Sequence, residues 1–335
     1  MKYLICLFSL FLLLGCDFKN NKHSQTTLSY YYWRTSFQLD SIEKKSLAEL
    51  NVKKLYIRYF DVVLQGNQAI PVSPIIFKES LPQLEVVPVV YIKNEVLINE
   101  QTNLYILAEK IVDFIRQVND VNDIDCQEIQ LDCDWTLQSK DRFFKLIEYI
   151  KKDIDWKLTS TIRLHQVKYA SKTGIPDVDS GVLMYYNMGT IASDSLNSIY
   201  DRSIAKKYIG GLKDYPLALD YAFPIYSWVV QSRNGKVIKL ISRVRLDDLK
   251  EKSGLKQISE FVFSVQEEGL YFGEYFQVGD QVKVESIKPE QLQEMKQDLY
   301  QASGKCPSEI ILYDLNSKNV TFYEKEVLEE LSLCK

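Results

Sequence analysis

Residues 128–136, Glu-Ile-Gln-Leu-Asp-Cys-Asp-Trp-Thr, constrain the fold of this chain more than any other stretch. Polar residues at the even positions alternate with mostly apolar residues at the odd positions, which is typical of a β-strand whose two faces meet different surroundings. The even face carries Asp132 and Asp134. A strand with one face in solvent would show the same alternation. Amphipathic helical patterns at residues 104–118 and 141–150 flank this one, however, and favour a strand inside an α/β fold.

The spacing of strand-like and helix-like segments predicts a single (β/α)8 TIM barrel over residues 28–335. In such a barrel the odd face of residues 128–136 packs on the outer helices and the even face points inward. Asp132 and Asp134 should then lie about 6–7 Å apart at the carboxyl ends of the strands, where barrel active sites form. We expect the eight strands at residues 28–34, 54–63, 86–92, 128–136, 157–165, 181–188, 217–224 and 309–315.

The interval between the seventh and eighth predicted strands has a pattern of its own. Residues 274–284 alternate around Gly279 and Asp280 and predict a β-hairpin, and residues 289–302 predict a helix. We interpret residues 229–304 as an insertion on the active-site side, where the loops that follow the strands lie.

The N-terminus has the features of a secretory signal peptide. A lysine precedes the apolar run 3–14, which is too short to span a bilayer. Its end, Leu-Leu-Gly-Cys at residues 13–16, resembles the bacterial lipobox, whose cysteine is lipidated and becomes the mature N-terminus. The alternative is an ordinary signal peptide that happens to contain a cysteine. We expect a signal peptide over residues 1–15, a lipid on Cys16, a flexible tether over residues 16–27, and attachment to a membrane of the bacterial cell envelope, inner or outer.

Cysteine and histidine usage narrows the remaining chemistry. Export permits disulfides, and Cys306 and Cys334, which flank the last strand and the last helix, are the expected pair. Cys133 should be a buried small apolar residue. With two histidines, a multi-histidine metal site is excluded, and we expect neither a metal nor a cofactor. The net charge of −4 gives no support to a nucleic-acid partner, and a monomer is expected.

Acids, amides, tyrosines and tryptophans gather at the predicted strand ends. Such a mixture is more typical of a carbohydrate site than of a site for apolar ligands, because sugars stack on aromatic rings and hydrogen-bond to polar groups. For any single residue a structural role is at least as well supported, since buried charges need partners. The candidate catalytic residues are Asp134, Asp132, Asp220 and Tyr185, and the candidate substrate-binding residues are Trp228, Tyr226, Asn187, Arg58, Arg163, Glu95 and Asp314.

Two short motifs resemble the chitinase-like family 18 glycoside hydrolases. Residues 131–136, Leu-Asp-Cys-Asp-Trp-Thr, resemble the strand-four motif Asp-x-x-Asp-x-Asp-x-Glu of that family. Residues 184–187, Met-Tyr-Tyr-Asn, resemble its strand-six motif Met-x-Tyr-Asp/Asn. Residues 130–134 and 217–226, with the lipoprotein start, are similar to a group of uncharacterised bacterial barrels, the family of domain of unknown function 3142. The resemblance covers most of residues 28–315 and implies a barrel that handles glycans.

The chain departs from the family 18 motif at two positions. Thr136 stands where the motif has its general-acid glutamate, and Ile129 stands in place of its first aspartate. A threonine cannot protonate a leaving glycosidic oxygen near neutral pH, so an acid would have to come from elsewhere. Two neighbouring aspartates can raise one another's pKa, which would let one of them hold a proton.

Our sequence-based assignment follows from that departure. Asp134 would face the substrate, with Asp132 as its charge partner held by Arg58 or Arg163. The second carboxylate would be Asp220, Asp314 or Glu95, Tyr185 would position the substrate, and Trp228 would stack on it. Two functions stay open: a lipid-anchored enzyme that binds and hydrolyses a glycan, and a non-catalytic glycan-binding or scaffolding lipoprotein. A third, an envelope assembly factor, would use the surface of the insertion.

Overall fold

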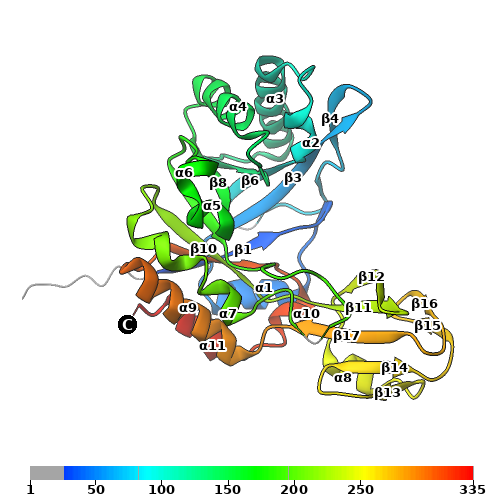
Figure 1. Cartoon of the computed structure of the whole chain (residues 1–335). Coiled ribbons are helices and arrows are strands. Elements are labelled where there is room, and N and C mark those ends of the chain that lie inside the picture. Colours follow the sequence, from blue (N-terminus) through cyan, green and yellow to red (C-terminus); the bar gives the residue numbers. More distant parts are fainter. Residues whose placement is uncertain (1–25, 82, 195, 335) are drawn as a thin grey trace, which may run out of the picture.

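The computed structural model describes residues 26–81, 83–194 and 196–334. Eight parallel strands close into a barrel, and β1 pairs with both β3 and β18 to complete the ring (Figure 1). The predicted TIM barrel is confirmed. Its strands are β1 (Thr27–Tyr32), β3 (Lys54–Gln65), β6 (Glu85–Ile92), β7 (Glu128–Asp132), β8 (Lys157–Arg163), β9 (Ser180–Met184), β10 (Leu219–Pro224) and β18 (Glu309–Tyr313).

Helices cover the outside of the barrel. The longest are α3 (Leu104–Asn122), α4 (Lys140–Asp153) and α9 (Pro289–Ser303). Each has an apolar face that recurs every three or four residues and is buried against the strands, as the sequence pattern predicts for α3 and α4. The shorter elements are α1 (Ser41–Glu49), α2 (Asn94–Ile98), α5 (Leu164–Lys168), α6 (Ala170–Thr173), α7 (Arg202–Ala205), η1 (Ile209–Asp214), α10 (Ser317–Val320), α11 (Lys325–Glu329) and η2 (Glu330–Ser332), with strands β2 (Ser36–Phe37), β4 (Gln68–Val72) and β5 (Ile76–Phe77).

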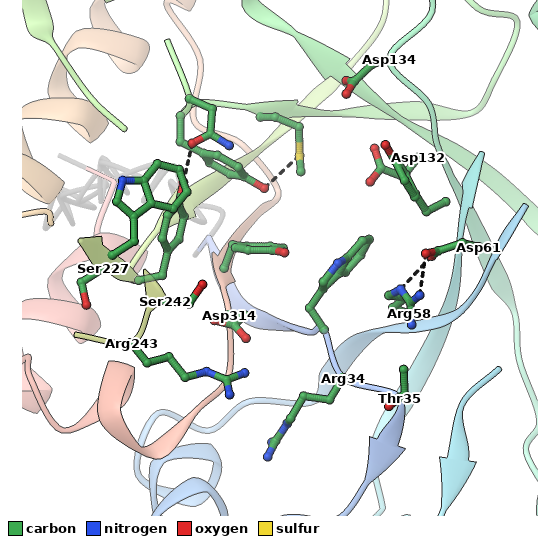
Figure 2. A pocket seen from close by; sticks show the side chains of 18 of the residues that line it. Arg34, Thr35, Arg58, Asp61, Asp132, Asp134, Ser227, Ser242, Arg243 and Asp314 are labelled. Atoms are coloured by element: carbon green, nitrogen blue, oxygen red, sulfur yellow. Dashed lines mark hydrogen bonds and ion pairs between the residues drawn. The ribbon is translucent and has the colours of Figure 1, made fainter. Parts of the chain in front are cut away.

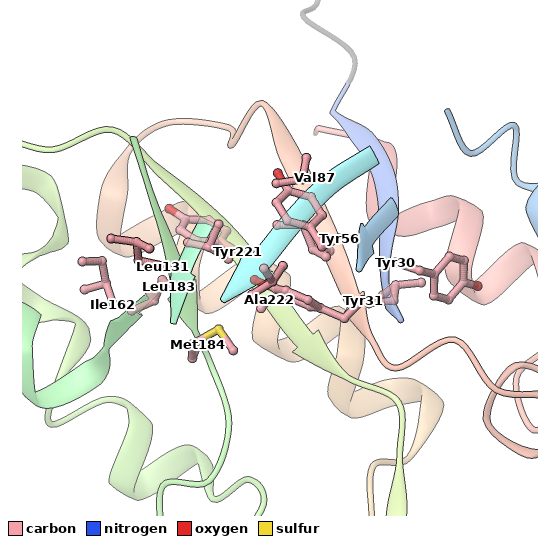
Figure 3. Packing of buried hydrophobic residues seen from close by; sticks show 14 of the residues in the cluster. Tyr30, Tyr31, Tyr56, Val87, Leu131, Ile162, Leu183, Met184, Tyr221 and Ala222 are labelled. Atoms are coloured by element: carbon pink, nitrogen blue, oxygen red, sulfur yellow. The ribbon is translucent and has the colours of Figure 1, made fainter. Parts of the chain in front are cut away.

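The outward face of the strands is apolar, and the interior of the barrel is largely polar and aromatic. Leu131, Ile162 and Leu183 lie together on the outer face of three neighbouring strands (Figure 3). Inside, the Tyr31 hydroxyl donates a hydrogen bond to Gln130 Oε1 at 2.7 Å. We call the amino-terminal end of the strands the floor of the barrel and the carboxyl-terminal end the mouth.

Buried charges at the floor neutralise one another. The Lys54 ammonium lies 3.3 Å from Glu128 and 3.5 Å from Glu309, and the Tyr56 hydroxyl donates to Glu309 at 2.7 Å. These groups close the lower end of the barrel, so the open cavity described below lies at the mouth.

A separate antiparallel sheet grows from the mouth after β10. It has the order β12-β11-β17-β14-β13 and a hydrophobic core of its own, built around Phe263, Phe276 and Val282. We call residues 227–286 the β lobe; it lies beside the barrel in Figure 1. It contains β11 (Ser227–Arg233), β12 (Lys236–Ser242), α8 (Leu246–Lys250), β13 (Leu255–Gln257), β14 (Val262–Val265), β15 (Gly269–Tyr271), β16 (Glu274–Phe276) and β17 (Gln281–Ser286).

Two expectations about this region are wrong in detail. The predicted hairpin over residues 274–284 does not form, because β16 pairs with β15 while β17 pairs with β11 and β14. The predicted helix is α9, but it buries Leu292, Met295 and Leu299 in the barrel core. It is therefore part of the barrel wall, and the inserted segment is shorter than residues 229–304.

Two of the cysteine predictions are confirmed. Cys306 and Cys334 are joined by a disulfide, with their Cα atoms 6.0 Å apart, and Cys133 is a buried free thiol. The predicted signal peptide, Cys16 and most of the tether fall outside the described residues. Within the described ranges, no helix is both long enough and apolar enough to cross a bilayer.

Candidate functional site

A cavity of about 990 Å³ opens at the mouth, between the barrel strands and the β lobe (Figure 2). Its lining combines aromatic rings with paired and unpaired charges. The lining residues are Trp33, Arg34, Thr35, Ser36, Gln38, Arg58, Asp61, Tyr91, Asp132, Asp134, Arg163, Met184, Tyr186, Asn187, Tyr226, Ser227, Trp228, Ser242, Arg243, Tyr313 and Asp314.

Asp132 and Asp134 both face this cavity from the end of β7, as the alternation predicts. Asp132 is almost fully buried and accepts a hydrogen bond from Thr161 Oγ1 at 2.7 Å. Burial raises the pKa of the Asp132 carboxyl, and the Arg163 charge opposes that effect only in part. Asp132 is thus a carboxyl that can keep its proton at a higher pH than a solvent-exposed aspartate.

Arg163 binds Asp134 rather than Asp132. Its Nη2 lies 3.1 Å from Asp134 Oδ2, and its Nε donates to Oδ1 of the same carboxylate. This is the bidentate geometry of a guanidinium–carboxylate pair. The Asp134 side chain is nevertheless 46% exposed, so a ligand in the cavity can reach it.

Arg58 does not hold Asp132, as the sequence-based assignment allowed, but pairs with Asp61. Its Nη2 lies 2.6 Å from Asp61 Oδ2, and its Nε donates to Oδ1 at 2.7 Å. On a regular strand, residues three apart point to opposite faces. Here the pairing with β6 shifts between Arg58 and Phe60, so Tyr59 forms a bulge and both charged side chains face the cavity.

The aromatic rings that line the cavity form one continuous cluster. Trp33 and Tyr313 lie with their ring centroids 5.7 Å apart, and Tyr226 and Trp228 with theirs 5.2 Å apart. The Tyr226 hydroxyl donates to Asn187 Oδ1 at 2.6 Å. The Trp228 indole nitrogen donates to Glu285 of the β lobe at 2.8 Å, which fixes the ring while leaving it half-buried. Fixed, partly exposed rings of this kind suit stacking against a flat ligand face.

Asp314 supplies a further carboxyl, from the end of β18. It is buried, and Asn319 Nδ2 donates to its Oδ1 at 2.6 Å. Burial raises the pKa of the Asp314 carboxyl, while the charges of Arg243 and Arg34 lower it by less. The mouth therefore contains two buried carboxyls, Asp132 and Asp314, whose pKa values are raised for the same physical reason.

Three predicted site residues lie elsewhere. Asp220 is near the start of β10, at the floor, where it accepts a hydrogen bond from the Glu309 backbone N–H at 2.8 Å. Tyr185 is fully buried and packs between Tyr200 and Phe223 on the outer face of the barrel. Glu95 is in α2, more than half exposed and outside the cavity lining.

The sequence contained a signal for one residue that was missed. In the pattern Met-x-Tyr-Asn at residues 184–187 the tyrosine of the motif is Tyr186, and Met184 and Tyr186 both line the cavity. Tyr185 lies between them and faces the other way, as strand alternation requires. Trp33, Tyr91, Arg243 and Tyr313 also line the cavity, and no motif in the sequence marks them.

Thr136, at the position of the family 18 glutamate, is exposed and outside the cavity lining. The part of the chain that the structure describes holds no cluster of three or more histidine, cysteine or acidic side chains arranged for a metal ion.

Comparison of the fold with solved structures finds chitinase-like barrels along nearly the whole chain. The chitinase from Chromobacterium violaceum has a TM-score of 0.58 at 11% sequence identity and covers 92% of this chain and 100% of its own. A chitinase from Bacteroides thetaiotaomicron gives 0.56 at 10% identity, over 92% and 97% of the two chains.

Two plant proteins share the same fold. A mutant of a class V chitinase from Cycas revoluta, solved with (GlcNAc)3, gives a TM-score of 0.55 at 9% identity, over 91% and 99% of the chains. A chitinase-like agglutinin from Robinia pseudoacacia gives 0.51 at 10% identity, over 91% and 99%. No family model matches the sequence, and no curated protein matches it. The chain therefore has the fold of the chitinase-like barrels, and its resemblance to the family of domain of unknown function 3142 stays a prediction.

Proposed function

We propose that this protein is a lipid-anchored barrel of the bacterial cell envelope that binds an oligosaccharide at its mouth. The observation that carries the proposal is the cavity itself, which is large, open and lined by aromatic rings interleaved with carboxylates, guanidinium groups and an amide. Sugars offer apolar ring faces to aromatic side chains and hydroxyls to polar ones, so one ligand can use both parts of this lining.

The comparisons support the same ligand class. The Cycas revoluta chitinase was solved with a GlcNAc oligomer, and the Robinia pseudoacacia protein is called an agglutinin rather than a chitinase. The same fold thus occurs in proteins described as chitinases and in one described as a chitinase-like agglutinin. Thr136, exposed and outside the cavity, favours binding without hydrolysis for this chain.

Isothermal titration calorimetry of the full-length chain in detergent against a panel of oligosaccharides would test the proposal. We expect saturable binding that weakens about tenfold in Trp33→Ala and in Trp228→Ala, since a stacked aromatic ring contributes on the order of 1 kcal/mol. Trp156→Ala is the matched control, because Trp156 lies outside the cavity and contacts Arg116. The proposal would be refuted if both mouth variants bound as tightly as the native chain, or if none of the oligosaccharides in the panel bound.

Hydrolysis of the bound glycan is a second candidate, and Asp132 is the observation that favours it. It is a buried carboxyl of raised pKa that lines the cavity beside Asp134. A proton held there could serve a leaving group, in the way that raised-pKa carboxyls serve as general acids. The native chain should then release reducing ends from the glycan, and the rate of release should fall at least a hundredfold in Asp132→Asn. Binding with no release by the native chain would leave the lectin-like function alone.

A further inference from the structure

The four arginines that line the cavity do not have equivalent surroundings. Arg58 is paired with Asp61, Arg163 with Asp134, and Arg34 with Glu43 at 2.8 Å. The Arg243 side chain, by contrast, has neither an ion pair nor a hydrogen bond with any residue of the described ranges. It is only partly exposed, and although its charge lowers the pKa of Asp314, no carboxylate of the described ranges lies within ion-pair distance of it.

The backbone holds Arg243 firmly at the junction of the β lobe and the barrel. Its φ of +63° is in the left-handed region, which is uncommon for a residue with a side chain. Its N–H donates to the carbonyl oxygen of Ser227 at 2.8 Å, and its own carbonyl accepts from Lys318 Nζ at 3.3 Å. Figure 2 shows the side chain extending along the cavity wall beside Asp314.

A second polar group without a partner lies next to this arginine. The Ser227 side chain lines the same cavity, is 1% exposed, and its Oγ has no hydrogen-bond partner among the described residues. Buried hydroxyls without a partner are rare because the loss of hydration costs free energy. Ser242, another lining residue, is paired across the sheet with Trp228. Ser242 therefore shares a face of the sheet with Trp228, the ring that we assign to sugar stacking, whereas Ser227 precedes Trp228 on β11 and points to the other face.

We propose that Arg243, together with the exposed Ser242 hydroxyl, binds the carboxylate of an acidic sugar whose ring stacks on Trp228. This inference rests on the proposed glycan-binding function and specifies its ligand class. A planar guanidinium matches a carboxylate with two parallel hydrogen bonds, and the Ser242 hydroxyl can donate to a remaining lone pair. A neutral glycan offers Arg243 no counter-ion.

The carboxyls nearby do not oppose such a ligand strongly. Asp61 and Asp134 are already paired with arginines. Asp132 and Asp314 are buried, their carboxyls accept hydrogen bonds from Thr161 and Asn319, and burial raises the pKa of each. Their negative charge therefore weakens as the pH falls, while a uronic acid of ordinary pKa stays ionised down to a lower pH.

The test compares acidic and neutral hexasaccharides on the full-length chain in detergent. The probes are a hyaluronan hexasaccharide and a hexagalacturonate, both rich in carboxylates, and chitohexaose, which has none. We expect at least one acidic probe to bind tenfold or more tightly than chitohexaose at low salt. That ratio should shrink towards one at high salt, because ionic contacts are screened.

Arg243→Asn should reduce the ratio of acidic to neutral affinity at least tenfold, and asparagine is chosen because it tolerates a left-handed backbone. Arg243→Lys, which keeps the charge but loses the planar fork, should give an intermediate ratio. Lys256→Gln is the matched control, since Lys256 is exposed on β13 of the same lobe and away from the cavity, and it should leave the ratio as it is.

The outcomes separate the two proposals. An unchanged ratio in Arg243→Asn, or in Arg243→Lys should the first variant fail to fold, would overturn the inference about acidic sugars. Chitohexaose binding as tightly as both acidic probes would also overturn it and leave glycan binding intact. Binding of no glycan in the wider panel would instead remove the proposed function on which the inference depends.

Discussion

The carboxyl groups in this barrel differ in which neighbouring groups compensate their negative charge. Asp61 and Asp134 have guanidinium partners, whereas Asp132 and Asp314, which are buried, and Asp220, which is half-buried, rely on hydrogen bonds. In the second group burial raises the pKa, which makes the ionised form a cost to the folded state. For Asp132 and Asp314, a role in ligand binding can explain why this destabilising carboxyl is kept. Asp220 lies at the floor, away from the cavity, where no such role is available.

Asp220→Asn should therefore stabilise the protein at neutral pH. Burial, helped by the charge of Glu309, raises the pKa of Asp220 from 3.8 to about 6. The folded state then holds a proton that the unfolded state has released, so the free energy of unfolding falls as the pH rises through that window. Asparagine keeps the oxygen that accepts the Glu309 N–H. We expect a gain of about 2 kcal/mol at pH 8 and almost none at pH 4 in urea unfolding. Equal effects at both pH values would contradict this account.

Two tyrosine hydroxyls should respond oppositely to removal. The Tyr185 hydroxyl is buried without a hydrogen-bond partner in the described structure, whereas the Tyr31 hydroxyl donates to buried Gln130. Tyr185→Phe should leave stability unchanged or raise it by about 1 kcal/mol, and Tyr31→Phe should lower it by about 1–2 kcal/mol. Thermal unfolding of the pair measures the contrast directly, and a greater loss in Tyr185→Phe would show that its hydroxyl has a partner.

At the level of the secondary-structure elements, the sequence predicts which face of a strand a side chain occupies. It predicts less well how far along the barrel axis the side chain lies and which strands pair. Alternation along residues 128–136 identified Asp132 and Asp134 as inward-facing, since one face of a barrel strand is always internal. The same pattern cannot tell that Asp220 starts its strand while Asp132 ends its own. Nor can it reveal the bulge at Tyr59 that brings Asp61 beside Arg58, because a bulge depends on the register with β6.

The β lobe exposes the same limit for strand pairing. Period-two alternation within residues 274–284 predicts a hairpin, yet β16 pairs with β15 while β17 pairs with β11 and β14. The apolar face of a strand can be buried in any sheet that offers an apolar neighbour, so the local sequence does not determine with which strands it pairs. The helix α9 was predicted in place, but only its contacts with the barrel core reveal which part of the fold it belongs to.

The disulfide links two secondary-structure elements, and its contribution to the free energy of unfolding can be measured. It joins Cys306, just before β18, to Cys334, after η2, across a sequence separation of 28. A cross-link of that length lowers the entropy of the unfolded chain and stabilises the folded state by about 3–4 kcal/mol. Cys306→Ser, Cys334→Ser and the double variant should each lower the melting temperature, and reducing agent should do the same to the native chain only. A double variant that melts as the native chain does would show that the bond adds nothing.

For the whole molecule, the proposed lipid on Cys16 decides where the barrel works. Expression in a bacterial host with an alkyne-labelled fatty acid should label the native chain and leave Cys16→Ser unlabelled. The native chain should also partition into the detergent phase of Triton X-114. Cys126→Ser, which alters a buried thiol of the folded body, is the control and should keep the label. Labelling of Cys16→Ser would contradict lipidation at this cysteine.

The direction in which β1 runs then determines which way the cavity opens relative to the proposed membrane attachment. The described body begins at Thr26, whose hydroxyl donates to the Pro307 carbonyl at the floor, and β1 rises from there towards the mouth. Nine residues lie between Cys16 and Thr26, so the ten residue steps from one to the other span at most about 35 Å. Were Cys16 lipidated, as we propose, the barrel would be attached to the bilayer from the side of its floor, with its mouth at the opposite end of the strands. Its opening would meet polysaccharide strands that lie above the lipid headgroups rather than the headgroups themselves.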